Sequence, residues 1–387
     1  MTNSKTSLSR RKFIALAGGG IVVAAGLGVG ANAMRTPANA LKPWGQAGSA
    51  YKEPRKRALS YAILAPNPHN RQPWKVDLSL LGKVILTVDT NRLLPHTDPF
   101  NRQITIGLGC FLEVMAMAAA QDGFRIDFEF FPDGHDETKL DTRPVAICSF
   151  SEDLSVKPDP LFASVLTRQS LKEPYDMTRG VDDGKLAILA GVGKFGSSIG
   201  TNNDPIAVAK MRKFTSDALL LEIETPRTYQ ESVDLFRIGT AEIEANPDGI
   251  DFSGPLFETL GLFGLMTRES SLDKGSTQYE QGIGAVLENA ETAMAHIWQV
   301  TTTNTRLDQI AAGRDWVRIN LAATAQGLGI QPLSQALQEY PEIQAYYKQV
   351  HDLLAPNGGT VQMLARLGYG ERVAQSPRWP LEAKITG

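Results

Sequence analysis

The sequence contains little cysteine and little histidine. Its only cysteines, Cys110 and Cys148, both lie in apolar runs, which favours two buried thiols, with a single disulfide as the alternative. The five histidines are scattered along the 387 residues, and no two have the spacing of metal ligands. These shortages exclude a disulfide-rich scaffold and give a metal site no support.

The chain also lacks a strong excess of charge of either sign. Its formal net charge is −3, with 42% hydrophobic and 21% charged residues, the balance of an ordinary globular protein. Residues 1–40 hold five basic and no acidic side chains, so the charge without them is about −8. Acidic chains are repelled by phosphate backbones and anionic lipids, so neither nucleic acid nor a membrane surface is expected as a partner.

The first forty residues have the pattern of an export signal. A basic start that includes Arg10 and Arg11 is followed by a weakly apolar run of Ala, Gly, Val and Ile, which resembles a twin-arginine signal peptide. Small residues place a cleavage point after Ala33 or after Ala40. The alternative is an uncleaved helix, which six glycines between Gly18 and Gly30 disfavour. We therefore expect a periplasmic protein, exported folded by the twin-arginine machinery.

Two glycine-rich motifs match known catalytic or cofactor-binding patterns in their residue types, but not in the structure expected around them. "GVGKFG" at 191–196 fits the dinucleotide fingerprint, and "GSSIG" at 196–200 fits the nucleophile elbow, but both patterns require a helix immediately afterwards. The residues that follow are typical of turns, and the next helix is expected only at Asp204-Pro205, an N-cap followed by a first-turn proline. We assign no catalytic residue to either motif.

Two long apolar stretches have the same form. Residues 104–124 and 315–330 are both rich in Ala and Leu, and in both the residue before the last is glycine, as at the ends of buried helices. A stretch typical of a strand follows each, at 125–131 and at 330–333. Either two similar halves pack about a pseudo-twofold axis or two core helices coincide in character.

The stretch "LAPNPHNRQPW" at 64–74 fits neither a helix nor an ordinary strand. Pro66, Pro68 and Pro73 fix φ and remove three backbone donors, which predicts a stiff polar loop. It resembles the "APS-x-x-N-x-Q-P-W" motif of the FMN-dependent nitroreductase family, with Asn67 where serine is usual. Three further segments are similar to family elements: "RQSLK" at 168–172, "GLGIQPLSQ" at 327–335 and "LGYGERVAQSPRW" at 367–379.

The resemblance implies an α+β nitroreductase-like fold with one non-covalent FMN. In it each half has a mixed β-sheet packed on long central helices. Arginine forks and a serine hydroxyl suit the flavin phosphate, and a rigid Pro/Asn loop suits the ring. Gln72 and Trp74 are expected to brace the loop, with Trp74 beginning a strand over residues 74–89 as its core anchor. The cofactor-binding residues implied are Pro66, Asn67, Pro68, Asn70, Arg168, Ser170, Pro332, Leu333, Ser334 and Arg378.

The order of these elements departs from that of the ordinary family, in which the Arg-x-Ser element precedes the proline-rich loop. Here the loop (65–74) comes first. The arrangement resembles a divergent branch in which one chain mimics the family dimer, which implies a monomer. Residues 41–157 would form the first half, with the flavin loop, and residues 158–387 the second, with the two arginines that hold the phosphate.

Residues 225–275, here called the insert, have no counterpart in the ordinary family. They combine the turn sequence Asn246-Pro247-Asp248-Gly249 with an apolar run at 256–266. Because apolar residues on such a stretch must be buried, we expect either a lid over the flavin or a packing element on the far side. Three functions fit: an oxidoreductase passing electrons to a nitroaromatic, quinone or similar acceptor, a flavin-storing protein, and a solute-binding module without cofactor.

Overall fold

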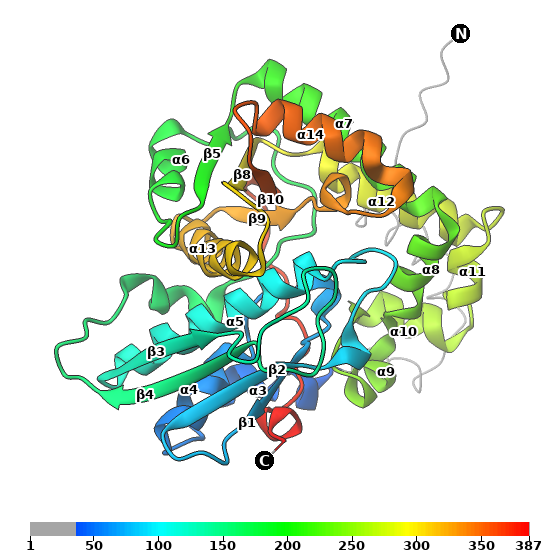
Figure 1. Cartoon of the computed structure of the whole chain (residues 1–387). Coiled ribbons are helices and arrows are strands. Elements are labelled where there is room, and N and C mark those ends of the chain that lie inside the picture. The colour runs from blue at the N-terminus through cyan, green and yellow to red at the C-terminus, as the bar shows by residue number, and fades with distance from the viewer. Residues whose placement is uncertain (1–35, 387) are drawn as a thin grey trace, which may run out of the picture.

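Two four-stranded sheets and two twenty-residue helices form the framework of the computed structural model, which describes residues 36–386. Helices α5 (Arg102–Gln121) and α13 (Arg306–Ala325) lie side by side between the sheets (Figure 1). One sheet contains β1 (Trp74–Asp77), β2 (Lys83–Val88), β4 (Ala146–Glu152) and β3 (Phe124–Phe130) in that spatial order. The other contains β5 (Ser198–Asn202), β8 (Ala295–Thr301), β10 (Thr360–Gly368) and β9 (Gly329–Pro332). The fold is α+β.

The two halves repeat one topology. Each has two strands, a long helix and two more strands in chain order, and in both sheets the fourth strand lies between the second and the third. The expectation of mixed sheets is wrong, because every ladder within these two sheets is antiparallel. A single parallel bridge, between Val76 and Ile385, attaches the C-terminal segment to β1.

The crossing of α5 and α13 depends on two glycines. A Cβ on Gly109 would lie 2.3 Å from the Ile310 carbonyl oxygen, and a Cβ on Gly313 would lie 2.0 Å from that of Ile106. The contact is reciprocal, since residues 106 and 310, like 109 and 313, are 204 positions apart. Reciprocal contacts of equivalent residues are the property of a twofold interface, here formed within one chain.

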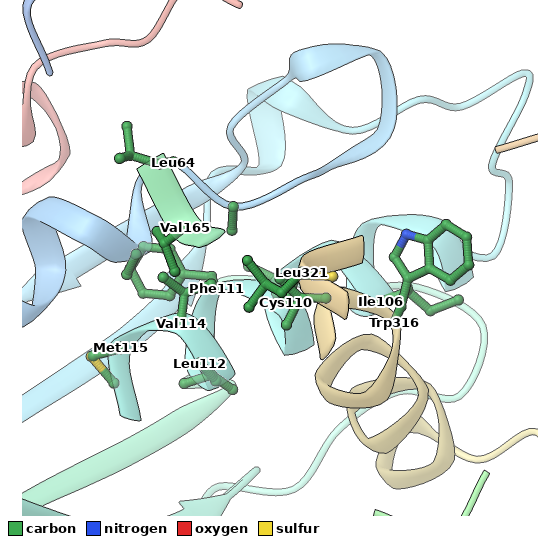
Figure 2. Close-up of a cluster of buried hydrophobic side chains, with 14 of the residues drawn as sticks. Leu64, Ile106, Cys110, Phe111, Leu112, Val114, Met115, Val165, Trp316 and Leu321 are labelled. Carbon is green, nitrogen blue, oxygen red and sulfur yellow. The ribbon is translucent and has the colours of Figure 1, made fainter. Parts of the chain in front are cut away.

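The side chains of these helices form the main hydrophobic core. In Figure 2, Phe111 and Cys110 of α5 lie near Val165 of the 3₁₀ helix Pro160–Thr167 and near Leu321 of α13. The α5 helix is apolar and long enough to cross a membrane, but most of it is buried inside the protein, as expected of a core helix. Cys110 and Cys148 are both free and buried, the favoured of the two expectations.

The remaining helices cover the halves. Those of the first half are α3 (Ala38–Gln46) and α4 (Pro54–Ala62), and those of the second are α6 (Asp183–Ala190), α7 (Pro205–Glu224), α12 (Thr277–Glu291) and α14 (Gln344–Leu354). The α7 helix begins as expected, with Asp204 as its N-cap and Pro205 in the first turn. The α13 helix begins earlier than expected, because Thr305 and Asp308 form a capping box.

Two other expectations about local structure are wrong. The stretch from Trp74 to Asp89 is a hairpin of β1 and β2, not a single strand. Residues 198–202, expected to be a turn, form β5 and pair with β8.

The insert is a small subdomain. It contains α8 (Pro226–Asp234), β6 (Phe236–Ile238), α9 (Gly239–Ala245), β7 (Ile250–Phe252), α10 (Pro255–Leu262) and α11 (Arg268–Leu272), and β6 pairs with β7 in parallel. The expectation that its apolar run is buried is wrong at one end: Leu262, Phe263 and Leu265 are exposed by 58%, 51% and 51%.

Candidate functional site: a buried pair of arginines

The proline-rich loop is stiff because it is bonded to itself. His69, Asn70 and Gln72 all have left-handed backbone conformations, with φ near +50°, which non-glycine residues seldom adopt. The Asn67 side chain holds this shape, since its Oδ1 accepts from the Gln72 amide at 2.7 Å and its Nδ2 donates to the Ala65 carbonyl at 3.1 Å. Asn67 thus braces the loop, and the contact with flavin that the resemblance implies for it stays a prediction.

Arg168 and Arg378 meet behind this loop although they are 210 positions apart. The Nη2 atoms of both donate to the Leu64 carbonyl, at 3.3 Å from Arg168 and 3.1 Å from Arg378. Arg378 also donates to Asn70 Oδ1 at 2.7 Å. Two distant segments therefore bring two guanidinium groups to one carbonyl at the start of the loop.

Both arginines are buried, and among the described residues neither forms an ion pair with a carboxylate. Their side chains expose 5% and 2% of their surface, and Arg168 Nη1 and Arg378 Nε have no hydrogen-bond partner among the described residues. Burial lowers the pKa of Arg168 to about 10. Burial, with the neighbouring Arg168 charge, lowers the pKa of Arg378 to about 9. Buried cations with unused donors fit an anionic ligand.

Further charges surround the pair. Burial lowers the pKa of the Lys172 ammonium, and Asp251 of β7 in the insert opposes that shift; Asp251 has the same opposing effect on Arg378. Burial also lowers the pKa of His69 to about 4, so its imidazole is neutral at pH 7. Lys172 as a residue is nevertheless exposed, so the lowered pKa reflects desolvation at its ammonium end alone. Ser170 lies between Arg168 and Lys172, and Leu171 beside it donates to Ile330 of β9.

Gln72 and Trp74 have the bracing role expected of them. Gln72 is fully buried; its Nε2 donates to the Pro247 carbonyl at 2.7 Å and its Oε1 accepts from the Trp379 amide at 2.9 Å. Trp74 packs on Phe111 with ring centroids 5.0 Å apart. Pro66 and Pro68 lie at the loop surface, only partly buried.

Pro332, Leu333 and Ser334, which the resemblance implies as flavin contacts, lie where β9 ends. Pro332 ends β9, and the Leu333 amide donates to the Leu364 carbonyl at 2.8 Å. Leu333 therefore has no free amide to offer a ligand, and its side chain is buried in a second hydrophobic cluster. Ser334 follows and is partly exposed, and it forms no hydrogen bond with Arg168 or Arg378.

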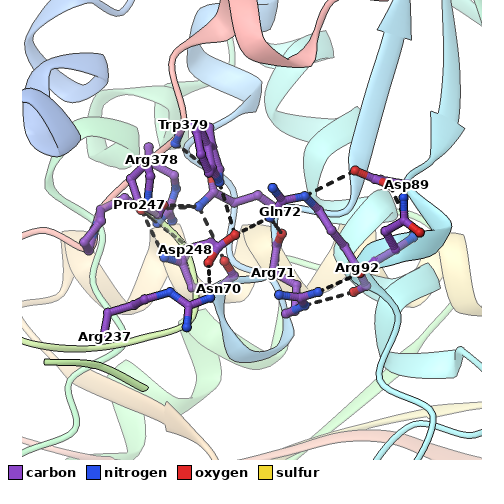
Figure 3. Close-up of polar contacts among 12 residues, drawn as sticks. Asn70, Arg71, Gln72, Asp89, Arg92, Arg237, Pro247, Asp248, Arg378 and Trp379 are labelled. Carbon is purple, nitrogen blue, oxygen red and sulfur yellow. Dashed lines mark hydrogen bonds and ion pairs between the residues drawn. The ribbon is translucent and has the colours of Figure 1, made fainter. Parts of the chain in front are cut away.

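The insert lies against the proline-rich loop rather than on the far side. Figure 3 shows Asp248 among cationic and aromatic side chains from separate elements. Its Oδ2 accepts from Arg92 and from Trp379 Nε1, and its Oδ1 accepts from Arg237 at 2.7 Å. The Gly249 amide donates to the Asn70 carbonyl at 3.3 Å. No local pattern marks Asp248 as a functional residue, because its partners Arg92 and Trp379 are distant in the chain.

A second contact fastens the start of the insert. Glu231 of α8 accepts from the backbone amides of His96 and Thr97, each at 2.9 Å. It adds to the contacts of Asp248 and of the neighbouring Pro247 and Gly249, which join the insert to the first half elsewhere.

A buried carboxylate at the base of the insert makes stability depend on pH. Burial raises the pKa of Glu222, near the end of α7, from 4.5 to about 7, although Gln338 donates to it. Since the folded protein binds this proton more tightly than the unfolded chain, the contribution is fully present below pH 4.5 and is lost as pH rises to about 7. We expect Glu222→Gln to be more stable than the parent by up to about 3 kcal/mol above pH 7, and equal near pH 4.5, in denaturant titrations. A constant difference across that range would contradict this.

Neither a metal site nor an open hollow competes with the arginine pair. Within residues 36–386 no group of three His, Cys, Asp or Glu side chains could hold a metal ion. A surface hollow between α7 and α14 is lined by residues that include Lys210, Lys213 and Tyr346, none of which the loop or the arginines contact. The site is thus defined by its converging donors.

The fold and site define a class of protein: a two-half α+β chain with a buried cationic pair behind a rigid loop. No family model matches the chain. A protein of Mycobacterium tuberculosis strain H37Rv, provisionally described as an NAD(P)H nitroreductase, is 24% identical over 323 residues, which cover 81% of this chain and 84% of that protein. A second, from the same strain and with the same description, is 30% identical over 122 residues, 31% of this chain and 37% of that protein.

Solved structures give distant likenesses. A provisionally described nitroreductase from Anabaena variabilis has a TM-score of 0.44 at 13% identity, covering 89% of this chain and 91% of its own. The FMN-dependent nitroreductase NfnB from Mycobacterium smegmatis, solved in complex with NADPH, has a TM-score of 0.36 at 16% identity, covering 58% and 96%. The similarity to nitroreductases thus rests on the curated relatives and the motifs, and the solved structures add no further argument.

Proposed function

We propose that this chain is an FMN-binding, nitroreductase-like oxidoreductase of the periplasm, exported by the twin-arginine route. The observation that carries the proposal is the pair of buried arginines, whose N–H groups left unused by the described residues suit the phosphate of FMN. Arg168 and Arg378 would hold that phosphate, with Ser170 and Lys172 beside them. Bound flavin would supply the electron-transfer chemistry.

The protein's own contribution is to bind, orient and shield. Asn70 fixes the Arg378 guanidinium, and Asn67 and Gln72 fix the loop. A loop that is ordered in advance loses little entropy when a ligand binds. No general base is needed at such a site, and none is proposed. The electron acceptor would be a nitroaromatic, a quinone or a similar small molecule.

One flavin per chain is proposed because the equivalent place in the second half is built differently. The loop before β5 corresponds in topology to the loop before β1. There the buried Asp315 carboxylate accepts from the amides of Lys194 and Phe195 and from the Ser197 hydroxyl. A carboxylate at this position repels a phosphate.

The first prediction concerns the cofactor. The purified protein should be yellow and release FMN on acid treatment at one molecule per chain, measured by absorbance against protein concentration. A ratio near two would contradict the assignment of a single site. Protein without flavin that also fails to bind added FMN would favour the solute-binding module instead.

The second prediction concerns assembly. Because α5 and α13 already form the twofold contact inside one chain, no second copy is needed to bury them. Light scattering at micromolar concentration should give the mass of a single chain. A dimer that persists on dilution would refute the single-chain interpretation of the repeat.

A flavin-storing protein remains the second candidate, and one observation favours it. The insert is fastened to the first half through Asp248, which pairs with Arg92, and through Glu231, which accepts from the Thr97 amide. A firmly closed lid would shield the flavin from large electron donors. Storage and turnover are separated by the rate at which NADPH reduces the bound flavin.

A further inference from the structure

The sequence offers two identical cleavage points for the export signal. The tripeptide Ala-Asn-Ala occurs at 31–33 and again at 38–40, and both have the small residues that signal peptidases require at positions −3 and −1. The two points differ by seven residues in the mature N-terminus. Composition and spacing do not separate them.

The second tripeptide belongs to the folded protein. Residues 38–40 form the first turn of α3, and Ala40 exposes only 3% of its surface. The Asn39 amide donates to Glu244 Oε1 in the insert at 2.8 Å. A peptidase binds its substrate as an accessible, extended segment, so cleavage after Ala40 would require α3 to unfold locally.

The α3 helix also holds one of the two arginines. The Ala40 carbonyl accepts the Arg378 backbone amide at 2.8 Å. Trp44 packs against the same residue, with the guanidinium carbon 5.3 Å from its ring centroid, and its Nε1 donates to the Ser376 carbonyl at 2.8 Å. Removing residues up to 40 would delete the acceptor of the Arg378 amide and shorten the helix that carries Trp44.

From these contacts we infer that the signal is removed after Ala33, that the mature chain begins at Met34, and that α3 is retained as a positioning element for Arg378. The inference rests on the proposed export in the folded state. Ala33 itself lies outside the described residues, and a cut there leaves every residue of α3 in place.

The test uses the full-length chain in its export host and the intact mass of the exported protein. The parent should have the mass of a chain that starts at Met34. Ala38→Asp should be processed identically, since Ala38 is exposed in the first turn of α3, where an acidic residue is tolerated. Ala31→Asp, its matched partner, should remain unprocessed.

An N-terminus at Leu41, or a block by Ala38→Asp but not by Ala31→Asp, would overturn the inference. Full-length protein that stays in the cytoplasm would overturn the export proposal itself, a different result. As a second readout, protein beginning at Met34 should bind FMN at least tenfold more tightly than protein beginning at Leu41. Should the shorter form fail to fold, Trp44→Phe in the Met34 form keeps the ring, loses the bond to Ser376 and should weaken FMN binding measurably. Unchanged affinity in that variant would show that α3 does not position Arg378.

Discussion

Arg168→Ala and Arg378→Ala should each weaken FMN binding by about 1.5–3 kcal/mol, roughly ten- to more than hundredfold. Each guanidinium is buried, and each keeps an N–H that no described residue accepts. A hydrogen bond from a charged donor to a phosphate in such surroundings is worth more than one at the surface. Fluorescence quenching of titrated FMN measures the loss.

Riboflavin and a third arginine provide the controls. Riboflavin has no phosphate, so its affinity should change little in either variant. Arg372→Ala removes an exposed arginine from the same C-terminal segment, whose side chain donates to the Thr167 carbonyl. This substitution should leave FMN binding intact. Equal losses for FMN and riboflavin would mean that the arginines hold the fold and not the phosphate.

The two variants should differ in stability without ligand. Among the described residues, the Arg168 side chain forms one hydrogen bond, to the Leu64 carbonyl. Its removal therefore relieves a buried charge at little cost. Arg378 is bonded to Asn70, Leu64 and Ala65, so its removal should destabilise the loop. Thermal unfolding of the flavin-free proteins checks this order.

Local patterns predicted the elements whose contacts are near in sequence. The apolar run ending at Gly123 identified α5, and Asp204-Pro205 identified the start of α7, because caps and apolar periodicity act within a few residues. The β1–β2 hairpin was missed because its turn carries Leu80 and Leu81, which are exposed by 48% and 96%. Apolar residues in this turn made the sequence resemble one continuous strand.

Long-range contacts could be predicted only through the family resemblance. No local sequence pattern indicates that Arg168 and Arg378 meet. Only the family motifs predicted that both belong to one binding site. The resemblance could not say that the Leu333 amide is used by β10, since the pairing of β9 and β10 is tertiary. Nor could it foresee Asp248, whose partner Arg92 is 156 positions away in an unremarkable loop.

Those unforeseen contacts decide how accessible the flavin would be. For NADPH to pass a hydride, its reacting carbon must come within about 3–3.5 Å of the acceptor atom. With the insert fastened at Asp248 and Glu231, we expect NADPH to reduce the bound flavin slowly or not at all, and dithionite, a small reductant, to bleach it readily. Stopped-flow absorbance of the flavin measures both rates.

Releasing the insert should change only the first of these rates. Asp248→Asn removes the charge that pairs with Arg92 of the first half, a loss of about 1.5–3 kcal/mol of closure, and should speed NADPH-driven reduction about ten- to hundredfold. Deleting residues 256–266 should act in the same direction. Glu242→Gln is the matched control, since Glu242 pairs with Arg268 inside the insert. Rapid reduction of a nitroaromatic by the unaltered protein with NADPH would refute the lid and leave an ordinary reductase. Equal acceleration by Glu242→Gln would instead mean that loosening of the insert as a whole, and not its attachment through Asp248, controls access.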